Sequence, residues 1–83
     1  MLEEFKNKLR EFNQERDWDQ FHSPKNLTMA LAGEVGELLE HFQWLTEKQS
    51  GKLDADKLKE VSEEIADIQI YLIQLADKLN IDI

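Results

Sequence analysis

Residues 58–79 of this 83-residue chain read LKEVSEEIADIQIYLIQLADKL, and this stretch decides the fold. Its apolar side chains recur every three or four positions, which is the spacing of one face of an α-helix. The stripe consists of Leu58, Val61, Ile65, Ile68, Leu72, Leu75 and Leu79. Either Asp54 or Asp56 can cap the free amides at its start. We therefore predict a long amphipathic helix that ends near Leu79.

A second long helix is predicted upstream of the first. Ser23 can cap its start, and Pro24 is tolerated at the first helical position. Its apolar stripe extends to about Lys48 and consists of Leu27, Leu31, Val35, Leu38, Phe42 and Leu45. Gly51 lies in the loop that follows. A shorter stripe predicts another helix over residues 2–15, with a connector over residues 16–22.

These elements predict one all-α domain over residues 1–83, a bundle of three to four helices without strands. A chain of this size buries only about 60% of its unfolded surface, so it commonly needs further support. Cysteine is absent, which excludes disulfides and thiolate metal sites. We expect homo-oligomerisation and a metal bound by carboxylates to complete the bundle.

Acidic residues occupy matching places on the two long helices. Glu34 and Glu37 lie one turn apart at the border of one apolar stripe, and Glu64 and Asp67 lie at the equivalent border of the other. The apolar residues beside the two pairs match at the same offset of 30 positions, as with Leu31 and Val61 or Leu38 and Ile68. If the stripes pack together, both pairs face a shared cleft, although Glu pairs are also common on solvated helices.

Carboxylates that converge beside apolar walls repel one another strongly and require a cation. Mg²⁺ prefers oxygen ligands, keeps several waters and also binds phosphate oxygens. Gly33 and Gly36 lie within the same helix, where each costs about 1 kcal/mol relative to alanine. Their missing side chains allow close approach of another helix or of a ligand.

The formal charge of −8, from 18 acidic and 10 basic residues, argues against extended contact with nucleic acid or anionic membrane. No apolar run is long enough to span a bilayer, and the first ten residues are too polar for a signal peptide. We therefore expect a soluble, cytoplasmic protein. A polyphosphate ligand would need cations between itself and the protein.

Three motifs together resemble the MazG-like nucleoside triphosphate pyrophosphohydrolases. They are Leu31-Ala-Gly-Glu-Val-Gly-Glu-Leu, Phe42-Gln-Trp and Glu63-Glu-Ile-Ala-Asp-Ile-Gln-Ile-Tyr-Leu. Arg16-Asp-Trp-Asp-Gln-Phe-His and Pro24-Lys-Asn-Leu resemble, more narrowly, the dCTP pyrophosphatase branch. The resemblance implies a homodimer or homotetramer that uses Mg²⁺, with Mn²⁺ as an alternative, to split a nucleoside triphosphate into monophosphate and pyrophosphate.

The resemblance also implies roles for individual residues. The metal ligands and catalytic residues would be Glu34, Glu37, Glu64 and Asp67. The base would be enclosed by Trp18 and by Trp44, and Trp44 is expected on the metal-facing row of the second long helix. Tyr71 would pack near the site. Lys25, Asn26 and Arg16 lie near the start of the second long helix, where free amides favour phosphate. Neither His22 nor His41 is assigned a catalytic role.

Relatives in this family usually continue past the position of Ile83 with basic and Asn residues that can contact phosphates. Either those contacts are absent from this sequence, or another chain of an oligomer supplies them. Two alternative functions also stay open. One is a non-enzymatic helical interaction or dimerisation module, and the other is a metal-dependent phosphohydrolase that acts on dUTP or on a phosphoribosyl substrate.

Overall fold

The structure is a computed structural model that describes residues 2–16, 18 and 22–82. Four helices follow in the order α1 (Leu2–Glu15), α2 (Pro24–Glu40), α3 (Glu47–Ser50) and α4 (Ala55–Lys78). No strand occurs among the described residues. The predicted all-α class and the bounds of the first helix are confirmed.

The capping residues explain where the two long helices begin and end. The Ser23 hydroxyl accepts a hydrogen bond of 3.1 Å from the Asn26 amide, and Pro24 opens α2. Asp54 is the cap of α4 and accepts from the Lys57 amide at 2.8 Å. Asn80, with φ 57°, adopts the left-handed conformation after α4, and the Ile81 amide donates back to the Ala76 carbonyl at 2.8 Å.

The prediction that the second long helix continues to about Lys48 was wrong, because α2 ends at Glu40. Tight turns follow, in which the Phe42 amide donates to Leu39 and the Leu45 amide to Phe42, both at 2.9 Å. A separate short helix, α3, then begins at a capping box. The Gln49 amide donates to the Thr46 hydroxyl at 3.1 Å, and the Thr46 amide donates to the Gln49 side chain at 2.9 Å.

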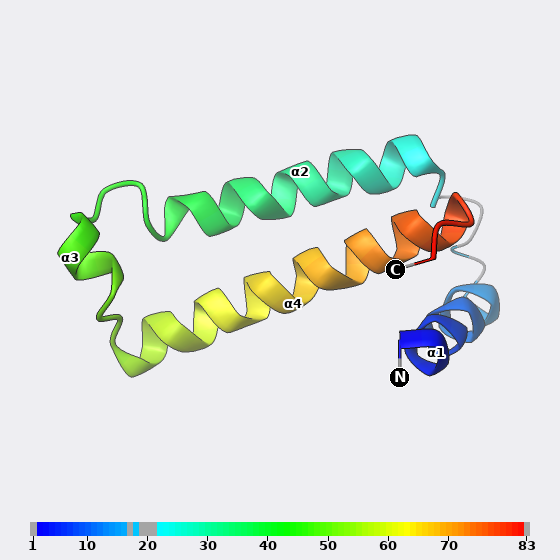
Figure 1. Cartoon of the computed structure of the whole chain (residues 1–83), viewed down its shortest axis with the longest axis horizontal. Coiled ribbons are helices and arrows are strands. Elements are labelled where there is room, and N and C mark those ends of the chain that lie inside the picture. The colour runs from blue at the N-terminus through cyan, green and yellow to red at the C-terminus, as the bar shows by residue number, and fades with distance from the viewer. Residues whose placement is uncertain (1, 17, 19–21, 83) are drawn as a thin grey trace.

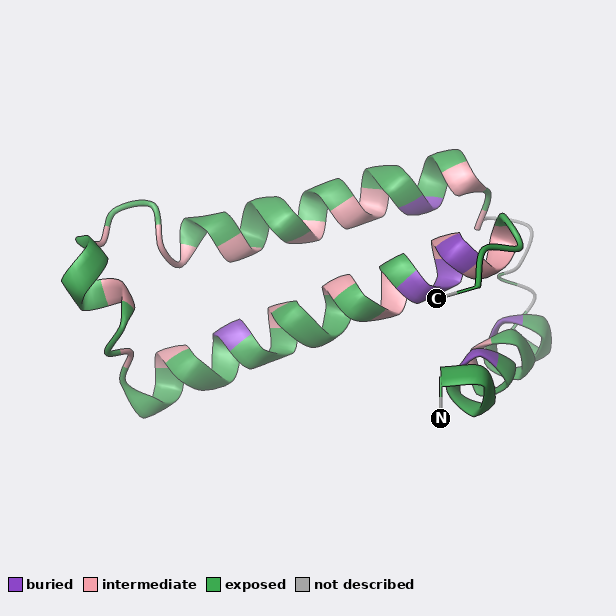
Figure 2. Cartoon of the chain, viewed as in Figure 1, coloured by how far each residue is buried: buried purple, intermediate pink, exposed green. Residues whose placement is uncertain are grey.

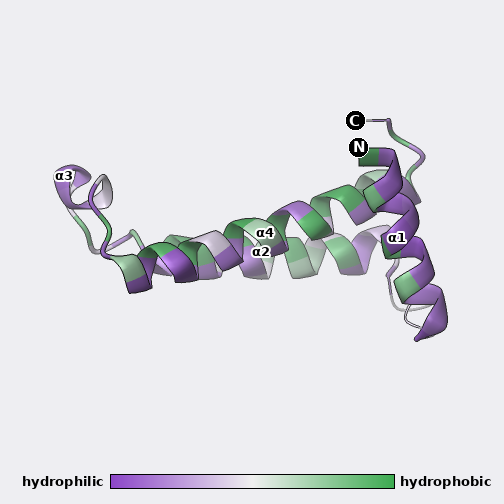
Figure 3. Ribbon diagram, turned by 90° about the horizontal axis from the view of Figure 1, so that it is seen from below, coloured by the Kyte–Doolittle hydropathy of each residue, from purple (hydrophilic) through white to green (hydrophobic). Residues whose placement is uncertain are grey.

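Helices α2 and α4 lie side by side and antiparallel, and α3 lies in the connection at one end of this hairpin (Figure 1). Helix α1 crosses the other end and packs against α4 (Figures 1 and 3). The buried apolar residues are Leu27, Val61, Ile73 and Ala76 (Figure 2). Hydrophobic and hydrophilic positions alternate along both long helices (Figure 3). None of the described helices is long and apolar enough to cross a membrane.

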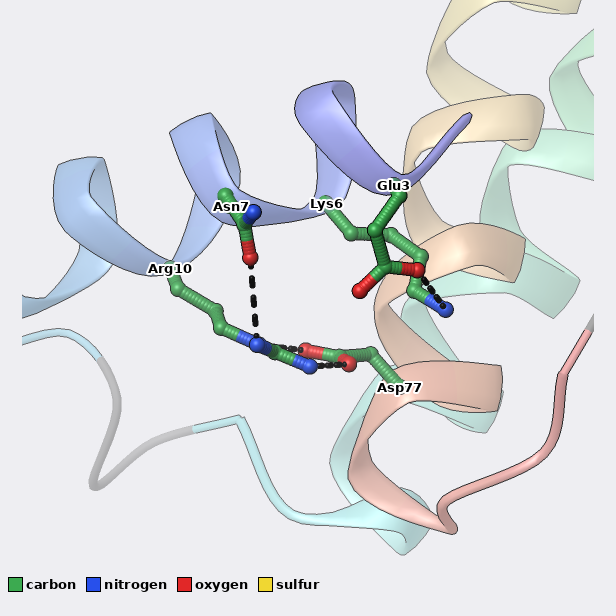
Figure 4. Close-up of polar contacts among 5 residues, drawn as sticks. All are labelled: Glu3, Lys6, Asn7, Arg10 and Asp77. Atoms are coloured by element: carbon green, nitrogen blue, oxygen red, sulfur yellow. Dashed lines mark hydrogen bonds and ion pairs between the residues drawn. The ribbon is translucent and has the colours of Figure 1, made fainter. Parts of the chain in front are cut away.

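An ion pair fastens α1 to the end of α4 (Figure 4). The Arg10 guanidinium donates two hydrogen bonds to the Asp77 carboxylate, one of them from Nε at 2.7 Å, and a third to the Asn7 side chain at 3.2 Å. These bonds from Arg10 hold the pKa of Asp77 below its usual value. The contact is bidentate, so it fixes direction as well as distance between the two helices.

Candidate metal and nucleotide site

The two long helices bring three of the four predicted carboxylates together. Glu34 and Glu37 of α2 and Glu64 of α4 each offer an oxygen, and these oxygens all lie within 4.8 Å of one another. Glu34 and Glu64 are partly buried between the helices, whereas Glu37 is exposed at the edge. A cluster of this size, with ligands from two rigid elements, could hold one ion.

The electrostatics of the cluster favour the binding of a cation. The pKa of Glu34 is raised from 4.5 to about 7, first by a hydrogen bond with the Glu64 carboxyl, then by burial, and then by the charges of Glu37, Asp67 and Glu64. One oxygen of Glu34 and one of Glu64 are buried with no hydrogen-bond partner among the described residues. Buried acceptors without hydrogen-bond partners, in a group of carboxylates whose oxygens lie within 4.8 Å of one another, fit a hard divalent cation, because such cations prefer oxygen ligands.

Asp67, the fourth predicted ligand, lies one turn after Glu64 on α4 and is exposed. Its oxygens are not among those of Glu34, Glu37 and Glu64 that lie within 4.8 Å of one another, but its charge contributes to the raised pKa of Glu34. It also lines the neighbouring cavity together with Glu34. The structure therefore places Asp67 beside the cluster, on the side that leads into the cavity.

A cavity of about 490 Å³ adjoins the carboxylates, between α1 and the hairpin. One part of its lining is aromatic and consists of Phe12, Trp18 and Tyr71. Besides Glu34 and Asp67, the polar lining residues are Lys8, Asn13, His22 and Gln74. A volume of this order is typical of small-molecule sites.

The aromatic wall is built where α1 ends. The rings of Phe12 and Trp18 meet edge to face, with centroids 5.4 Å apart and planes inclined by 68°. The Arg16 guanidinium lies 3.7 Å from the Phe12 ring centroid and 5.8 Å from that of Trp18. The Trp18 amide also donates to the Asn13 carbonyl at 2.9 Å. These contacts hold Trp18, still 44% exposed, at the mouth of the cavity.

The structure does not bring every predicted contact to this cavity. Trp44 was expected on the metal-facing row of a continuous helix, but it lies in the turns beyond α2 and is 86% exposed. Lys25 and Asn26 are exposed in the first turn of α2, outside the lining residues. The Asn26 amide already donates to Ser23, so it is not one of the free amides expected to favour phosphate.

Other lining residues were not predicted from the sequence. Asn13 is 5% exposed and Gln74 is 9% exposed, and both line the cavity. His22, which was assigned no role, also lines it, with a buried Nδ1 that has no partner among the described residues. Gln74 continues the row of Glu64, Asp67 and Tyr71, so helical spacing could have indicated it. No sequence signal marks Asn13, because its place depends on how α1 packs.

Comparison with known proteins shows the family to which the chain is related. The sequence profile of the MazG-like family matches residues 30–83, which include both acidic pairs. The chain belongs to the MazG-like family. This MazG-like chain is 46% identical over 85 residues to a rat (Rattus norvegicus) protein named dCTP pyrophosphatase 1, and 44% identical over 84 residues to the Homo sapiens protein of that name.

The alignments cover 99% of this chain but 49% of each mammalian protein, so the chain spans about half the length of these relatives. A crystal structure of a pyrophosphatase from Archaeoglobus fulgidus has the same fold, with a TM-score of 0.89 and 43% sequence identity. That match covers 96% of this MazG-like chain and 75% of the archaeal chain.

Proposed function

We propose that this MazG-like chain hydrolyses nucleoside triphosphates, dCTP or related deoxynucleotides first among them, to the monophosphate and pyrophosphate with Mg²⁺. The observation that carries the proposal is the position of the carboxylate cluster at one wall of a cavity lined by aromatic side chains. Phosphates bound through a cation at the cluster leave the base within reach of the aromatic wall. The names of the mammalian and archaeal relatives support the same reaction class.

In this proposal Glu34, Glu37, Glu64 and Asp67 would hold Mg²⁺. When bound, Mg²⁺ would neutralise charge on the phosphate oxygens and would lower the pKa of an attacking water. A glutamate of the cluster accepts the proton that this water releases as it attacks the α-phosphorus. The partly buried walls around Glu34 and Glu64 strengthen each of these charge interactions, because the local dielectric is low.

The base contacts are proposed on the aromatic wall, with Trp18 and Tyr71 as the stacking partners. Arg16, held over Phe12, is placed to approach a phosphate or a base at the cavity mouth. Trp44, Lys25 and Asn26 do not line the cavity of this chain. We propose that they contact the nucleotide bound by a second copy.

Replacing Trp18 by alanine is expected to weaken dCTP binding by about 10- to 100-fold, because stacking of one base on an aromatic side chain is worth about 1–3 kcal/mol. The KM for dCTP should rise far more than kcat falls, since Trp18 is not part of the carboxylate cluster. Trp18→Phe serves as the matched control and should retain most of the affinity. Steady-state kinetics measure both, and an unchanged KM in Trp18→Ala would remove the residue from the base site.

The outer face of the hairpin supports a homodimer or homotetramer. One row of α4 recurs at the heptad interval and stays about half exposed: Leu58 at 54%, Ile65 at 46%, Leu72 at 48% and Leu79 at 49%. On α2, Leu39 is 56% exposed. Apart from its chain neighbours and the backbone of its own helix, a Cβ at Gly33 or Gly36 would meet no described atom within 4 Å. Close packing within the chain therefore does not explain these glycines, whereas the close approach of a second copy or of a ligand would.

Replacing Leu72 by glutamate is expected to shift the assembly towards monomers, because a charge would be buried in the interface. Light scattering of the wild type and the variant measures the mass, with the exposed Gln69→Glu on the same helix as control. A wild-type protein that is monomeric at high concentration would contradict the proposed assembly.

A screen of nucleoside triphosphates for pyrophosphate release, with and without Mg²⁺, tests the function. We expect Mg²⁺-dependent release from at least one deoxynucleotide. A non-enzymatic interaction module would release none and would bind no nucleotide, whereas a phosphohydrolase of different specificity would act on dUTP or on a phosphoribosyl substrate. Product analysis separates these outcomes.

The proposed physiological role is cleansing of the cytoplasmic nucleotide pool. A strain that lacks the protein should accumulate modified deoxynucleotides. Unchanged nucleotide pools in such a strain would count against this role.

A further inference from the structure

Gln74 lies on the same face of α4 as the predicted site residues of that helix. Glu64, Asp67, Tyr71 and Gln74 follow one another at alternating helical intervals, so all four lie on one face of α4. Gln74 lies about 10 Å along the helix axis from Asp67, at a rise of about 1.5 Å per residue. The row therefore runs from the carboxylates, past an aromatic side chain, to an amide at the far end of the cavity.

The Gln74 amide is buried without satisfying its hydrogen-bonding capacity. The side chain is 9% exposed, and its Oε1 has no hydrogen-bond partner among the described residues. A buried acceptor that stays unpaired costs about 1–3 kcal/mol. Its burial comes from the packing of α1 across α4, and Asn13 of α1, 5% exposed, lines the same cavity. A ligand that donates a hydrogen bond there would recover that cost.

We propose that Gln74 Oε1 accepts a hydrogen bond from the exocyclic amino group of a nucleobase, so that the site selects amino-bearing bases over those with a carbonyl at that position. The inference rests on the proposed function, because it requires the phosphates of a nucleotide to lie at the carboxylates of α4. With phosphates at Glu64 and Asp67, the base stacks beside Tyr71 and Trp18, and its edge reaches Gln74. The order of groups along the helix matches the order of groups in a nucleotide.

Cytosine and uracil differ in the group that would meet this oxygen. With the unpartnered Oε1 turned towards the base, the amino group of cytosine donates to it, whereas the carbonyl oxygen of uracil would leave two acceptors facing each other. Sites with a buried polar group reject ligands that leave the group unpaired. At about 1–3 kcal/mol for the unpaired acceptor, we expect a preference for dCTP over dUTP of about 10- to 100-fold in kcat/KM.

The test compares dCTP and dUTP on the full chain with Gln74→Met, which keeps the side-chain length and removes the oxygen. Pyrophosphate release gives kcat/KM for each substrate. The wild type should prefer dCTP, and Gln74→Met should lose most of that preference, because dCTP loses its hydrogen bond and dUTP no longer meets an unpaired acceptor. The matched control is Gln69→Met, an exposed glutamine on the same helix, which should keep the wild-type ratio.

Three outcomes would overturn the inference. The first is a dCTP preference that survives in Gln74→Met, the second is an equal loss for both substrates, and the third is a wild type without preference. Circular dichroism checks that the variant is folded. If Gln74→Met does not fold, Gln74→Asn retains the amide but withdraws it by one methylene, and it should reduce the preference as well. A wild type that releases no pyrophosphate from any nucleotide would instead overturn the proposed function itself.

Discussion

Replacing Glu37 by glutamine or Asp67 by asparagine is expected to reduce Mg²⁺-dependent pyrophosphate release by more than about 100-fold. Loss of a group that merely supports a metal ligand commonly costs 10- to 100-fold, so loss of a ligand should cost more. Both substitutions keep the size of the side chain and remove its charge. Since both residues are exposed at the edge of the site, helicity should not change.

The control for this prediction is Glu63→Gln, which removes one charge from an exposed position of α4 next to Glu64. It should retain wild-type activity, because its side chain is not part of the carboxylate cluster. Activity is measured as pyrophosphate release at saturating Mg²⁺, with circular dichroism as the check on folding. If Glu37→Gln and Asp67→Asn both react at the wild-type rate, the assigned metal ligands are wrong.

Without a divalent cation, the free energy of unfolding is expected to fall as the pH rises from 4.5 to about 7. The pKa of Glu34 is raised from 4.5 to about 7 in the folded chain, chiefly by the Glu64 carboxyl and by burial. In this interval the folded state holds a proton that the unfolded state has released. Stability is therefore greatest below the unfolded pKa and declines as the pH rises through the folded pKa.

Mg²⁺ should reverse this decline, because it replaces the proton as the positive charge among the carboxylates. At a concentration 100 times its Kd, the ion adds about 2.7 kcal/mol, or on the order of 10–20 °C in Tm for a domain of this size. Thermal unfolding at pH 5 and pH 8, with and without Mg²⁺, measures both effects. Glu34→Gln should abolish both, whereas the exposed Glu40→Gln should leave them intact. An equal Mg²⁺ response in the two variants would argue against binding at Glu34.

The sequence was most informative where local chemistry determines structure. The apolar stripe of α4 and the caps at Ser23 and Asp54 are short-range signals, and the structure confirms each of them. The acidic pairs occupy matching positions at the edges of the apolar stripes of α2 and α4. Packing of the two stripes was therefore expected to bring these carboxylates together. Three of these four groups lie within 4.8 Å of one another.

The end of α2 was predictable in principle but was predicted incorrectly. The apolar residues Phe42 and Leu45 continue the helical period, so they favoured a helix through the turns that follow Glu40. The capping box of Thr46 and Gln49 carries the opposing signal, and capping hydrogen bonds prevailed over periodicity there. The same error placed Trp44 on the metal-facing row of a helix.

The cavity could be predicted only in part. Its outer wall is formed by α1, whose position depends on long-range contacts such as that between Arg10 and Asp77. Spacing along one helix contains no information about a contact of this kind. For this reason Trp18 and Tyr71 were identified by resemblance, whereas Asn13 emerged only from the packing of α1.

The central claim is that α2 and α4 together present one divalent-cation site, and crystals grown with Mn²⁺ test it most directly. Anomalous scattering locates the ion without reference to activity. We predict an anomalous peak between the two helices, at bonding distance from oxygens of Glu34, Glu37 and Glu64. Mn²⁺ bound only at other acidic residues, or an empty cluster at saturating Mn²⁺, would contradict the account.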